Sequence, residues 1–385
     1  MKDLNRSYAA FDQASTLVCV IELSQNSWLL AGAVPGLERQ PRKKLSTQPH
    51  ELLGQIRKWH GEAKKAGRQI TRIVAAFEAG RDGFWLARWL RNHEIEVYAI
   101  HAGSIPVPRE HRRPKTDRLD TEMLMRALLG WLRGEPRHCR MVQIPTLEEE
   151  DARRPNRERE VIVREQTRLV NRVKSTMAWL GITGFKLTAR VTRKALAKLR
   201  TPNGEPIPPL TLGELDHDLE RLALVRKQIK EIEERRVKQL KVKPADGTNP
   251  LVLLLLQVRG VGIETADLLV HEVLTRNLRD HRAVARYAGL TGSPSESGKM
   301  RREQGLAKSG NTRVRCSLLQ LAWRWLIWQR DSALAQWYRG RVADASGGIR
   351  KKMIVALARK ILIGLWRLVT TGEMSGGIVL KAAAI

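Results

Sequence analysis

The chain has 385 residues, and its 69 Lys and Arg against 40 Asp and Glu give a formal net charge of +29. Hydrophobic residues make up 42% and charged residues 28%, which excludes wholesale disorder. At about 100–200 residues per domain, this length predicts two or three domains. So large a positive charge indicates a polyanionic partner, with nucleic acid as the first candidate. An anionic membrane surface would require a basic amphipathic helix or a hydrophobic anchor, and the sequence shows neither.

Cysteine spacing and apolar runs bear on the cellular compartment. Cys19, Cys139 and Cys316 lie far apart without metal-ligand spacing, which argues against a zinc site or a disulfide scaffold. No apolar stretch follows the first basic residues, so we expect no signal peptide. The longest apolar run, residues 251–256, is far shorter than the roughly 20 residues that cross a bilayer. We therefore expect a soluble protein of the reducing cytosol that does not bind a membrane.

The N-terminal part alternates between strand and helix patterns, which predicts an α/β domain with a mixed sheet. The expected strands are Tyr8–Phe11, Thr16–Leu23, Trp28–Val34, Ile73–Phe77 and Ile95–Ile100, and the expected helices are Glu51–Lys65 and Phe84–Leu90. Residues 105–118 contain three prolines and several basic residues and are predicted to form a loop. An apolar helix from about Met123 to Trp131 follows it.

The remaining two thirds of the chain is predicted to be mainly helical. Apolar residues at helical spacing in 162–180 and 215–232 flank a turn at Pro202–Pro209, which indicates an antiparallel hairpin or an oligomer-forming coiled coil. Two helices packed on a larger body would give the same pattern. Residues 242–250 read as a linker, and helices continue to about residue 370. Four tryptophans in that last part are predicted to be core residues, namely Trp323, Trp325, Trp328 and Trp337.

Four carboxylates are candidates for a metal site. We expect Asp12 to end a short strand and Glu78 to end the most apolar one, while Asp117 and Asp120 lie three apart at the start of a helix. Crowded carboxylates of this kind suit Mg²⁺ or Mn²⁺, and paired ions are typical of phosphodiester chemistry. Each residue also has a plainer interpretation, as a helix-terminal charge, an arginine partner or a strand-end charge in water.

Two further motifs could contact nucleic acid. Gly260 and Gly262 lie between two helical stretches, as in a helix-hairpin-helix whose backbone amides approach a phosphate, or as in a plain interhelical turn. Ser297 lies in a polar segment before Gly298 and a strongly basic stretch. It is placed to meet a phosphate, although composition alone describes a solvated loop serine. Because no histidine is near in sequence, a Ser-His-Asp hydrolase has no support.

These motifs resemble the DEDD-type transposases of the insertion-sequence 110 family, including its 1111 subgroup, which are recombinases guided by a bridge RNA. The resemblance rests on Asp12, FEAG around Glu78, KTDRLD around Asp117 and Asp120, VRGVGIETADLLVHEV, YAGLTGSPSESG and GLAKSGNTRVR. It covers about residues 6–130 and 250–365. The chain departs from the family pattern at Ala10 and Gly292, where the family usually has Gly and Pro.

The resemblance implies three domains: a RuvC-like domain of the RNase H fold at 1–145, a helical coiled-coil linker at 146–245, and a C-terminal transposase domain at 246–385. It implies a metal-binding tetrad that holds two ions and a serine nucleophile that becomes covalently attached to DNA. The implied tetrad is Asp12, Glu78, Asp117 and Asp120, and the implied nucleophile is Ser297. The implied partners are donor and target DNA, a guide RNA and further copies of the chain in a homodimer or homotetramer. The implied setting is the bacterial cytoplasm, in association with the nucleoid.

Basic residues around these motifs are expected to contact phosphates, so that binding falls steeply with salt. They are Arg112, Arg113, Lys115, Arg118, Lys299, Arg301, Arg302, Lys308, Arg313 and Arg315, together with the amides of Gly260 and Gly262. Two other functions fit part of the pattern. A Holliday-junction or RNase H-like nuclease would use the same metal site with water as nucleophile. A basic nucleic-acid-binding scaffold would use the carboxylates only structurally.

Overall fold

The structure, a computed structural model, describes residues 11–80, 82–106, 116–135, 138–187, 193–298, 300–307, 309–343, 347–374 and 376–381. The chain divides into two compact units, Met1–Leu147 and Glu148–Ile385, and each is described by itself. Within the described ranges, every helix is too short or too polar to span a lipid bilayer. The predicted division of the second unit into a linker and a transposase domain stays a prediction.

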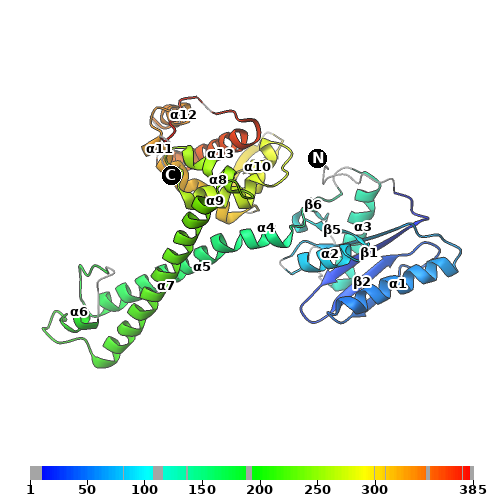
Figure 1. The fold of residues 1–385 in the computed structure, drawn as a ribbon, viewed down its shortest axis with the longest axis horizontal. Coiled ribbons are helices and arrows are strands. Elements are labelled where there is room, and N and C mark those ends of the chain that lie inside the picture. The colour runs from blue at the N-terminus through cyan, green and yellow to red at the C-terminus, as the bar shows by residue number, and fades with distance from the viewer. Residues whose placement is uncertain are drawn as a thin grey trace. The chain divides into compact units, whose positions relative to one another are not determined.

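A six-stranded mixed sheet forms the centre of the first unit, with strand order β3-β2-β1-β4-β5-β6 (Figure 1). The strands are β1 Thr16–Leu23, β2 Trp28–Ala33, β3 Arg42–Leu45, β4 Arg72–Glu78, β5 Glu96–Ile100 and β6 Met141–Val142. β1, β4 and β5 are parallel to one another, whereas β2, β3 and β6 are each antiparallel to a neighbour. The prediction of a mixed α/β unit is confirmed.

Helices cover both faces of this sheet because successive side chains of a strand point to opposite faces. Leu17, Cys19 and Ile21 of β1 pack with residues of α1 (Pro49–Lys65) and α2 (Phe84–Arg91). Val18 and Val20 pack on the other face, with residues of α3 (Asp117–Leu132). A short 3₁₀ helix, Ala102–Ser104, follows β5. The apolar cores on the two faces fix the orientation of each strand, and so determine the face to which each side chain at a strand end belongs.

The sequence-based boundaries in this unit agree with the structure to within a few residues, with two exceptions. β3 was not predicted because its sequence, RKKL, is charged except for Leu45, and β6 was not predicted because it has only two residues. Residues 8–10 of the expected first strand lie outside the described residues. Phe11 lies before β1 and outside any strand.

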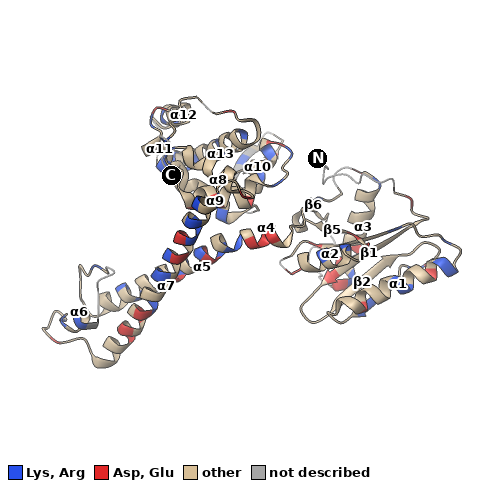
Figure 2. Ribbon diagram, viewed as in Figure 1, with Lys and Arg blue, Asp and Glu red and all other residues tan. Residues whose placement is uncertain are grey.

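Two long helices of the second unit form the predicted antiparallel hairpin. They are α5 (Arg154–Trp179) and α7 (Pro209–Val242). Val173 near the end of α5 packs with Leu215 near the start of α7, whereas Ile162 packs with Ile232. Figure 2 shows basic and acidic residues interspersed along both helices.

The other helices and a two-stranded ribbon complete the second unit. They are α4 Leu147–Ala152, α6 Arg193–Ala197, α8 Asn249–Gln257, α9 Ile263–Leu269, a π-helix at Val270–Leu274, α10 His281–Tyr287, α11 Thr312–Trp328, α12 Ala333–Val342, α13 Gly347–Thr371, β7 Gly292–Ser297 and β8 Met300–Leu306. The predicted polar loop around Ser297 is therefore a β-ribbon. Trp325 is buried and Trp337 packs against the core, but Trp323 and Trp328 are about half exposed, so the core prediction is wrong for these two.

A buried polar network joins α5 and α7 to α9. The Arg236 guanidinium lies 3.3 Å from an Asp267 carboxylate oxygen and also pairs with Glu264. The Asn156 amide donates to Asp267 at 2.7 Å and accepts from Arg236 at 3.0 Å. Burial alone would raise the pKa of Asp267, but its hydrogen bond with His271 and the positive charge of Arg236 outweigh burial and lower the pKa. The ionised form of Asp267 therefore holds this junction together.

Replacing Asp267 with Asn should lower the free energy of unfolding by about 3 kcal/mol, because Arg236 would be left buried without its full partner. The lowered pKa also predicts that the wild-type contribution is present above the ordinary aspartate pKa of 3.8 and is lost as pH falls below it. Urea unfolding at neutral pH measures the first effect. Asp246→Asn, which breaks an exposed pair with Lys243, should change stability by less than about 0.5 kcal/mol. Equal shifts in the two variants would contradict a stabilising role for the buried junction.

Candidate active site

Two glutamates lie side by side at one edge of the sheet. In the parallel pair β1–β4, Ile21 is the partner of Phe77, so Glu22 and Glu78 follow one residue further along each strand. Neighbouring strands lie about 4.8 Å apart. Glu22 lies two residues after Val20, and Glu78 lies two residues after Ala76. Since side chains two residues apart share a face of the sheet, both glutamates belong to the face that α3 covers. The sheet therefore places two carboxylates on one face at its carboxyl edge.

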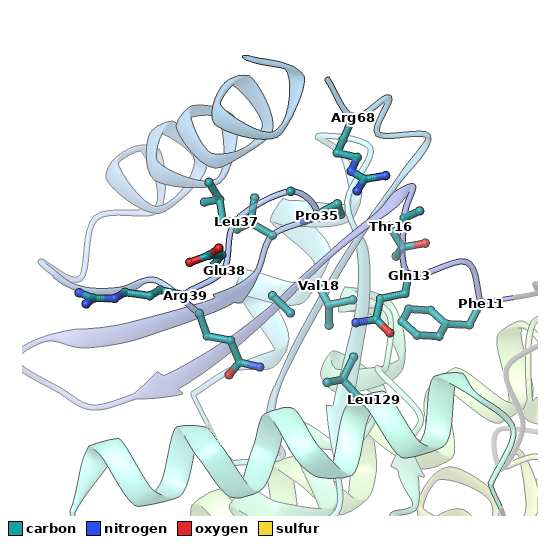
Figure 3. A pocket seen from close by; sticks show the side chains of 15 residues that line it. Phe11, Gln13, Thr16, Val18, Pro35, Leu37, Glu38, Arg39, Arg68 and Leu129 are labelled. Atoms are coloured by element: carbon teal, nitrogen blue, oxygen red, sulfur yellow. The ribbon is translucent and has the colours of Figure 1, made fainter. Parts of the chain in front are cut away.

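Two contacts, at different positions along β1, show in which direction α3 runs relative to that strand. Glu122 of α3 forms an ion pair of 2.6 Å with Arg42 of β3, which is level with Val20 through the pairing of β3, β2 and β1. Seven residues further on, Leu129 lines the same hollow as Thr16 at the start of β1 (Figure 3). α3 therefore runs antiparallel to β1, and its first turn lies toward the carboxyl edge of the sheet.

The first turn of α3 contributes two more carboxylates, Asp117 and Asp120. Thr116 caps the helix by accepting a hydrogen bond from the backbone NH of Leu119 at 3.3 Å, which fixes where the turn begins. Since this turn lies toward the carboxyl edge, the structure brings both aspartates to the end of the sheet that carries Glu22 and Glu78. Acidic residues also favour a helix N-terminus without any ligand, so the turn by itself has a structural explanation.

Asp12 lies at the opposite edge of the sheet. It was predicted to end a strand, but it lies in a turn four residues before β1. Its carboxylate accepts hydrogen bonds from the Ala14 amide at 3.0 Å and the Ser15 hydroxyl at 2.5 Å. The Ser15 bond, followed by the Ala14 bond, lowers the pKa of Asp12. The structure therefore explains Asp12 as a turn residue and does not bring it together with Glu78.

Glu22 is a carboxylate at this edge of the sheet that the sequence analysis did not include among the candidates. It lies next to last in a strand whose bounds, Thr16–Leu23, were predicted correctly. Like Glu78, it lies at the carboxyl end of a buried apolar strand. This shared position is the sequence feature from which Glu22 could have been predicted. The assignment of Asp12 relied instead on a short strand at Tyr8–Phe11, and Phe11 is not part of any strand.

The chemistry of this edge suits a hard divalent cation. Four carboxylates supply the oxygen ligands that Mg²⁺ and Mn²⁺ prefer. Glu78 and Asp117 are exposed, and Glu22 and Asp120 are partly buried. In the part of the chain that the structure describes, no three Asp, Glu, His or Cys side chains already converge as a metal site. Holding an ion would therefore require rotation of these side chains toward one another.

The hollow in Figure 3 lies at the amino edge of the sheet and does not belong to this site. It encloses about 420 Å³. Its charged lining residues are Glu38, Arg39 and Arg68, so it presents one carboxylate and two guanidinium groups. This composition does not suit a divalent cation, and we assign the hollow no role in catalysis.

Ser297 lies at the exposed end of the β7–β8 ribbon. It is the last residue of β7 and is the pairing partner of Met300. Gly298, which begins the connection, has a φ of +55°, a conformation that favours glycine. Apart from its chain neighbours, no atom lies within 4 Å of the position that a β-carbon would take at Gly298, and Gly298 is exposed. The ribbon thus presents the Ser297 hydroxyl to solvent.

The base of the same ribbon is held firmly. The Arg315 guanidinium donates to the carbonyl oxygens of Gly289 at 3.4 Å and Ala307 at 3.2 Å, which lie on either side of the ribbon. Asn311 caps α11 through its side-chain oxygen and donates to Glu272 at 3.0 Å. Gly310 has a φ of +102° and lies directly against Gly289. The GLAKSGNTRVR motif therefore builds the support of the serine ribbon.

The predicted phosphate-contacting residues fall into three groups. Arg112, Arg113, Lys115, Lys299 and Lys308 lie outside the described residues, as does the Arg301 side chain. Arg118 and Arg302 are exposed. Arg313 is bonded to Glu160 and Arg315 supports the ribbon, so these two have structural partners. Their contribution to nucleic-acid binding stays a prediction.

The two predicted glycines form the connection between α8 and α9. Gly260 has a φ of +93°, and Gly262 is the residue before the first turn of α9. A β-carbon at Gly260 would lie 3.2 Å from Cβ of Trp328. Whether this connection acts as a helix-hairpin-helix or as a plain interhelical turn stays a prediction, and the tight packing on Trp328 gives Gly260 a structural reason.

Two comparisons with known proteins both indicate a transposase. Residues 252–339 match the family described as "Transposase IS116/IS110/IS902 family". The chain is 39% identical over 372 residues to a protein of Sinorhizobium fredii (strain NBRC 101917 / NGR234) described as "Putative transposase y4rJ". That alignment covers 94% of this chain and 93% of the relative.

Replacing Gly310 with Ala should destabilise the base of the serine ribbon. The added β-carbon would lie 2.5 Å from the Gly289 backbone, and an L-residue is strained at this φ. We expect a loss of about 2–4 kcal/mol in the free energy of unfolding, measured by urea denaturation. In contrast, Gly340→Ala should be neutral or stabilising by up to about 1 kcal/mol, because Gly340 lies within α12 with open space around it. A neutral Gly310→Ala variant would show that this contact is not important.

Proposed function

Because this chain belongs to the IS116/IS110/IS902 family of transposases, we propose that it cuts and rejoins DNA strands using a carboxylate-held metal site and Ser297 as nucleophile. The transposase function itself follows from the family. The observation that carries the finer proposal is that two neighbouring strand-end glutamates and the acidic first turn of α3 share one edge of the sheet. The strand order and directions also support the RuvC-like assignment.

The proposed metal site consists of Glu22, Glu78, Asp117 and Asp120 and would hold one or two Mg²⁺ or Mn²⁺ ions. Such ions, when bound, stabilise the negative charge that develops on a phosphate during strand cleavage. The protein holds the four carboxylates on rigid elements, since Glu22 and Glu78 end central strands and the aspartates begin a capped helix. Asp12 is left out of this site because its carboxylate is engaged in a turn at the other edge.

The proposed chemistry at Ser297 exchanges one phosphate ester for another. As the bond from serine Oγ to phosphorus forms, the hydroxyl proton leaves, and the departing strand oxygen takes up a proton as its bond to phosphorus breaks. Rejoining reverses the exchange, with a strand hydroxyl displacing Oγ. A serine hydroxyl is a weak nucleophile and needs activation, which a divalent metal ion would supply. Because the covalent ester keeps the energy of the broken bond, no nucleotide cofactor is needed.

The resemblance also extends the proposal to a guide RNA and to a homodimer or homotetramer. The net charge of +29 supports a partner rich in phosphate. Exposed Arg118 at the start of α3 and exposed Arg302 on β8 would meet phosphates near the two proposed catalytic elements. With target choice delegated to base pairing, the protein would need few side chains that read bases.

Replacing Ser297 with Ala should abolish a covalent protein–DNA adduct. The assay incubates the protein with Mg²⁺, its element's RNA and labelled donor and target DNA, and resolves the products on a denaturing gel. The matched control is Ser295→Ala, because Ser295 lies two residues away on the same exposed strand. We expect an adduct with the wild type and with the control only. Cleaved DNA without an adduct in all three proteins would mean that water is the nucleophile and that the protein is a nuclease.

Replacing Glu22 with Gln should reduce strand cleavage by at least about 100-fold, because the amide cannot replace an anionic ligand. Asp12→Asn should retain cleavage to within a few-fold, since Asp12 lies outside the proposed site. Cleavage rates at saturating Mg²⁺ test both, and calorimetric titration with Mn²⁺ reports metal binding separately. If Asp12→Asn abolished cleavage and Glu22→Gln cleaved normally, Asp12 and not Glu22 would belong to the metal site, as the family resemblance implies.

A further inference from the structure

The outer side of α11 combines exposed apolar side chains with two arginines, the partly buried Arg324 of α11 and the exposed Arg259 of the α8–α9 connection. Trp323 and Ile327 lie four residues apart and are neighbours on the helix, with 52% and 58% of their surfaces exposed. Arg324 and Trp328 repeat this spacing one residue further on, and Trp328 is 47% exposed. The Arg259 guanidinium lies over the Trp328 ring, 5.4 Å from its centroid. These five residues are called the α11 patch below.

The backbone beneath this patch is fixed by buried hydrogen bonds. The fully buried Gln329 side chain donates to the carbonyl oxygens of Arg259 and Val379, each at 2.8 Å, and accepts from the Val379 amide at 2.8 Å. Gly260 packs closely against Trp328, where a β-carbon would be only 3.2 Å from Cβ of Trp328. The Arg324 side chain donates to the Thr265 hydroxyl of α9 at 3.0 Å. The patch is therefore preorganised, so that a ligand would not have to order it.

We propose that the α11 patch binds single-stranded DNA, with unpaired bases stacking on Trp323 and Trp328 and with Arg259 and Arg324 contacting the neighbouring phosphates. Exposed aromatic rings beside cationic side chains are what proteins use to hold single strands without sequence preference. The charge around the patch is complementary to such a ligand. Arg324 and Arg259 both belong to the patch, and neither the last two turns of α11 from Trp323 to Trp328 nor the Val258–Gly262 connection contains an acidic residue.

The composition of the patch favours this occupant over two others. The buried centre of a protein–protein interface is depleted in charge, whereas here Arg259 and Arg324 alternate with the aromatic rings. A DNA duplex keeps its bases stacked inside the helix, so the indoles could not stack on them. Cutting and exchanging strands exposes unpaired bases, so this inference rests on the transposase function. It does not depend on Ser297 or on the metal site.

The experiment measures binding of labelled single-stranded DNA by fluorescence anisotropy, with EDTA present so that catalysis does not contribute. Trp323→Ala and Trp328→Ala should each weaken binding about ten-fold, whereas Trp323→Phe should stay within about three-fold because Phe can still stack. Binding of a duplex of the same sequence should change less than two-fold. The matched control is Trp85→Ala in the first unit, because Trp85 is 44% exposed and should not affect binding.

Three outcomes would overturn the proposal. Equal losses for duplex and single strand would assign the patch to phosphate contacts alone. A loss confined to single-stranded RNA of the same sequence would make RNA the ligand. Unchanged DNA binding with an altered sedimentation coefficient would make the patch an interface between copies of the chain. Circular dichroism of each variant establishes that it is folded, and Trp323 is exposed enough for the substitution to be tolerated.

Discussion

The parallel pairing of β1 with β4 is the constraint on which the candidate site depends. Because Ile21 pairs with Phe77, the next residues, Glu22 and Glu78, are neighbours and lie on the same face of the sheet. A shift of one residue in either strand would turn one carboxylate to the opposite face, beneath α1 and α2. The register is held by apolar side chains on both faces, since Ile21 and Phe77 belong to one core and Val20 and Ala76 to the other. The stability of the sheet and the position of the site therefore have the same cause.

In the second unit, the base of the ribbon that carries Ser297 is tightly held and its end is exposed. The Ser297 end of the β7–β8 ribbon is exposed, whereas its base is fixed by Arg315, Asn311 and the close approach of Gly289 and Gly310. The helix hairpin of α5 and α7 is tied to α9 by the buried network around Arg236. Several residues of the sequence motifs, such as Arg315 and Asn311, therefore stabilise the fold through their contacts.

Much of the fold could be predicted because periodicity reports burial directly. β1, β4, α1 and the α5–α7 hairpin all have apolar residues at the spacing that their packing requires. The failures also have physical reasons. The ribbon around Ser297 is exposed and polar, so it carries no apolar alternation, and α11 exposes tryptophans that a buried helix would cover. Asp12 and Glu22 could not be separated by local pattern, because only the register of β1 against β4 determines which carboxylate lies beside Glu78.

The most direct test of this account locates the bound metal on the chain itself. Fe²⁺ replaces Mg²⁺ at such sites, and with ascorbate and peroxide it generates hydroxyl radicals that cut the nearby backbone. Mass spectrometry of the fragments then reads the cutting positions. We predict cuts near Glu22, Glu78 and the Asp117–Asp120 turn, all suppressed by excess Mg²⁺. Suppressible cuts near Asp12, with none near Glu22, would contradict the assignment of the metal site to the carboxyl edge of the sheet.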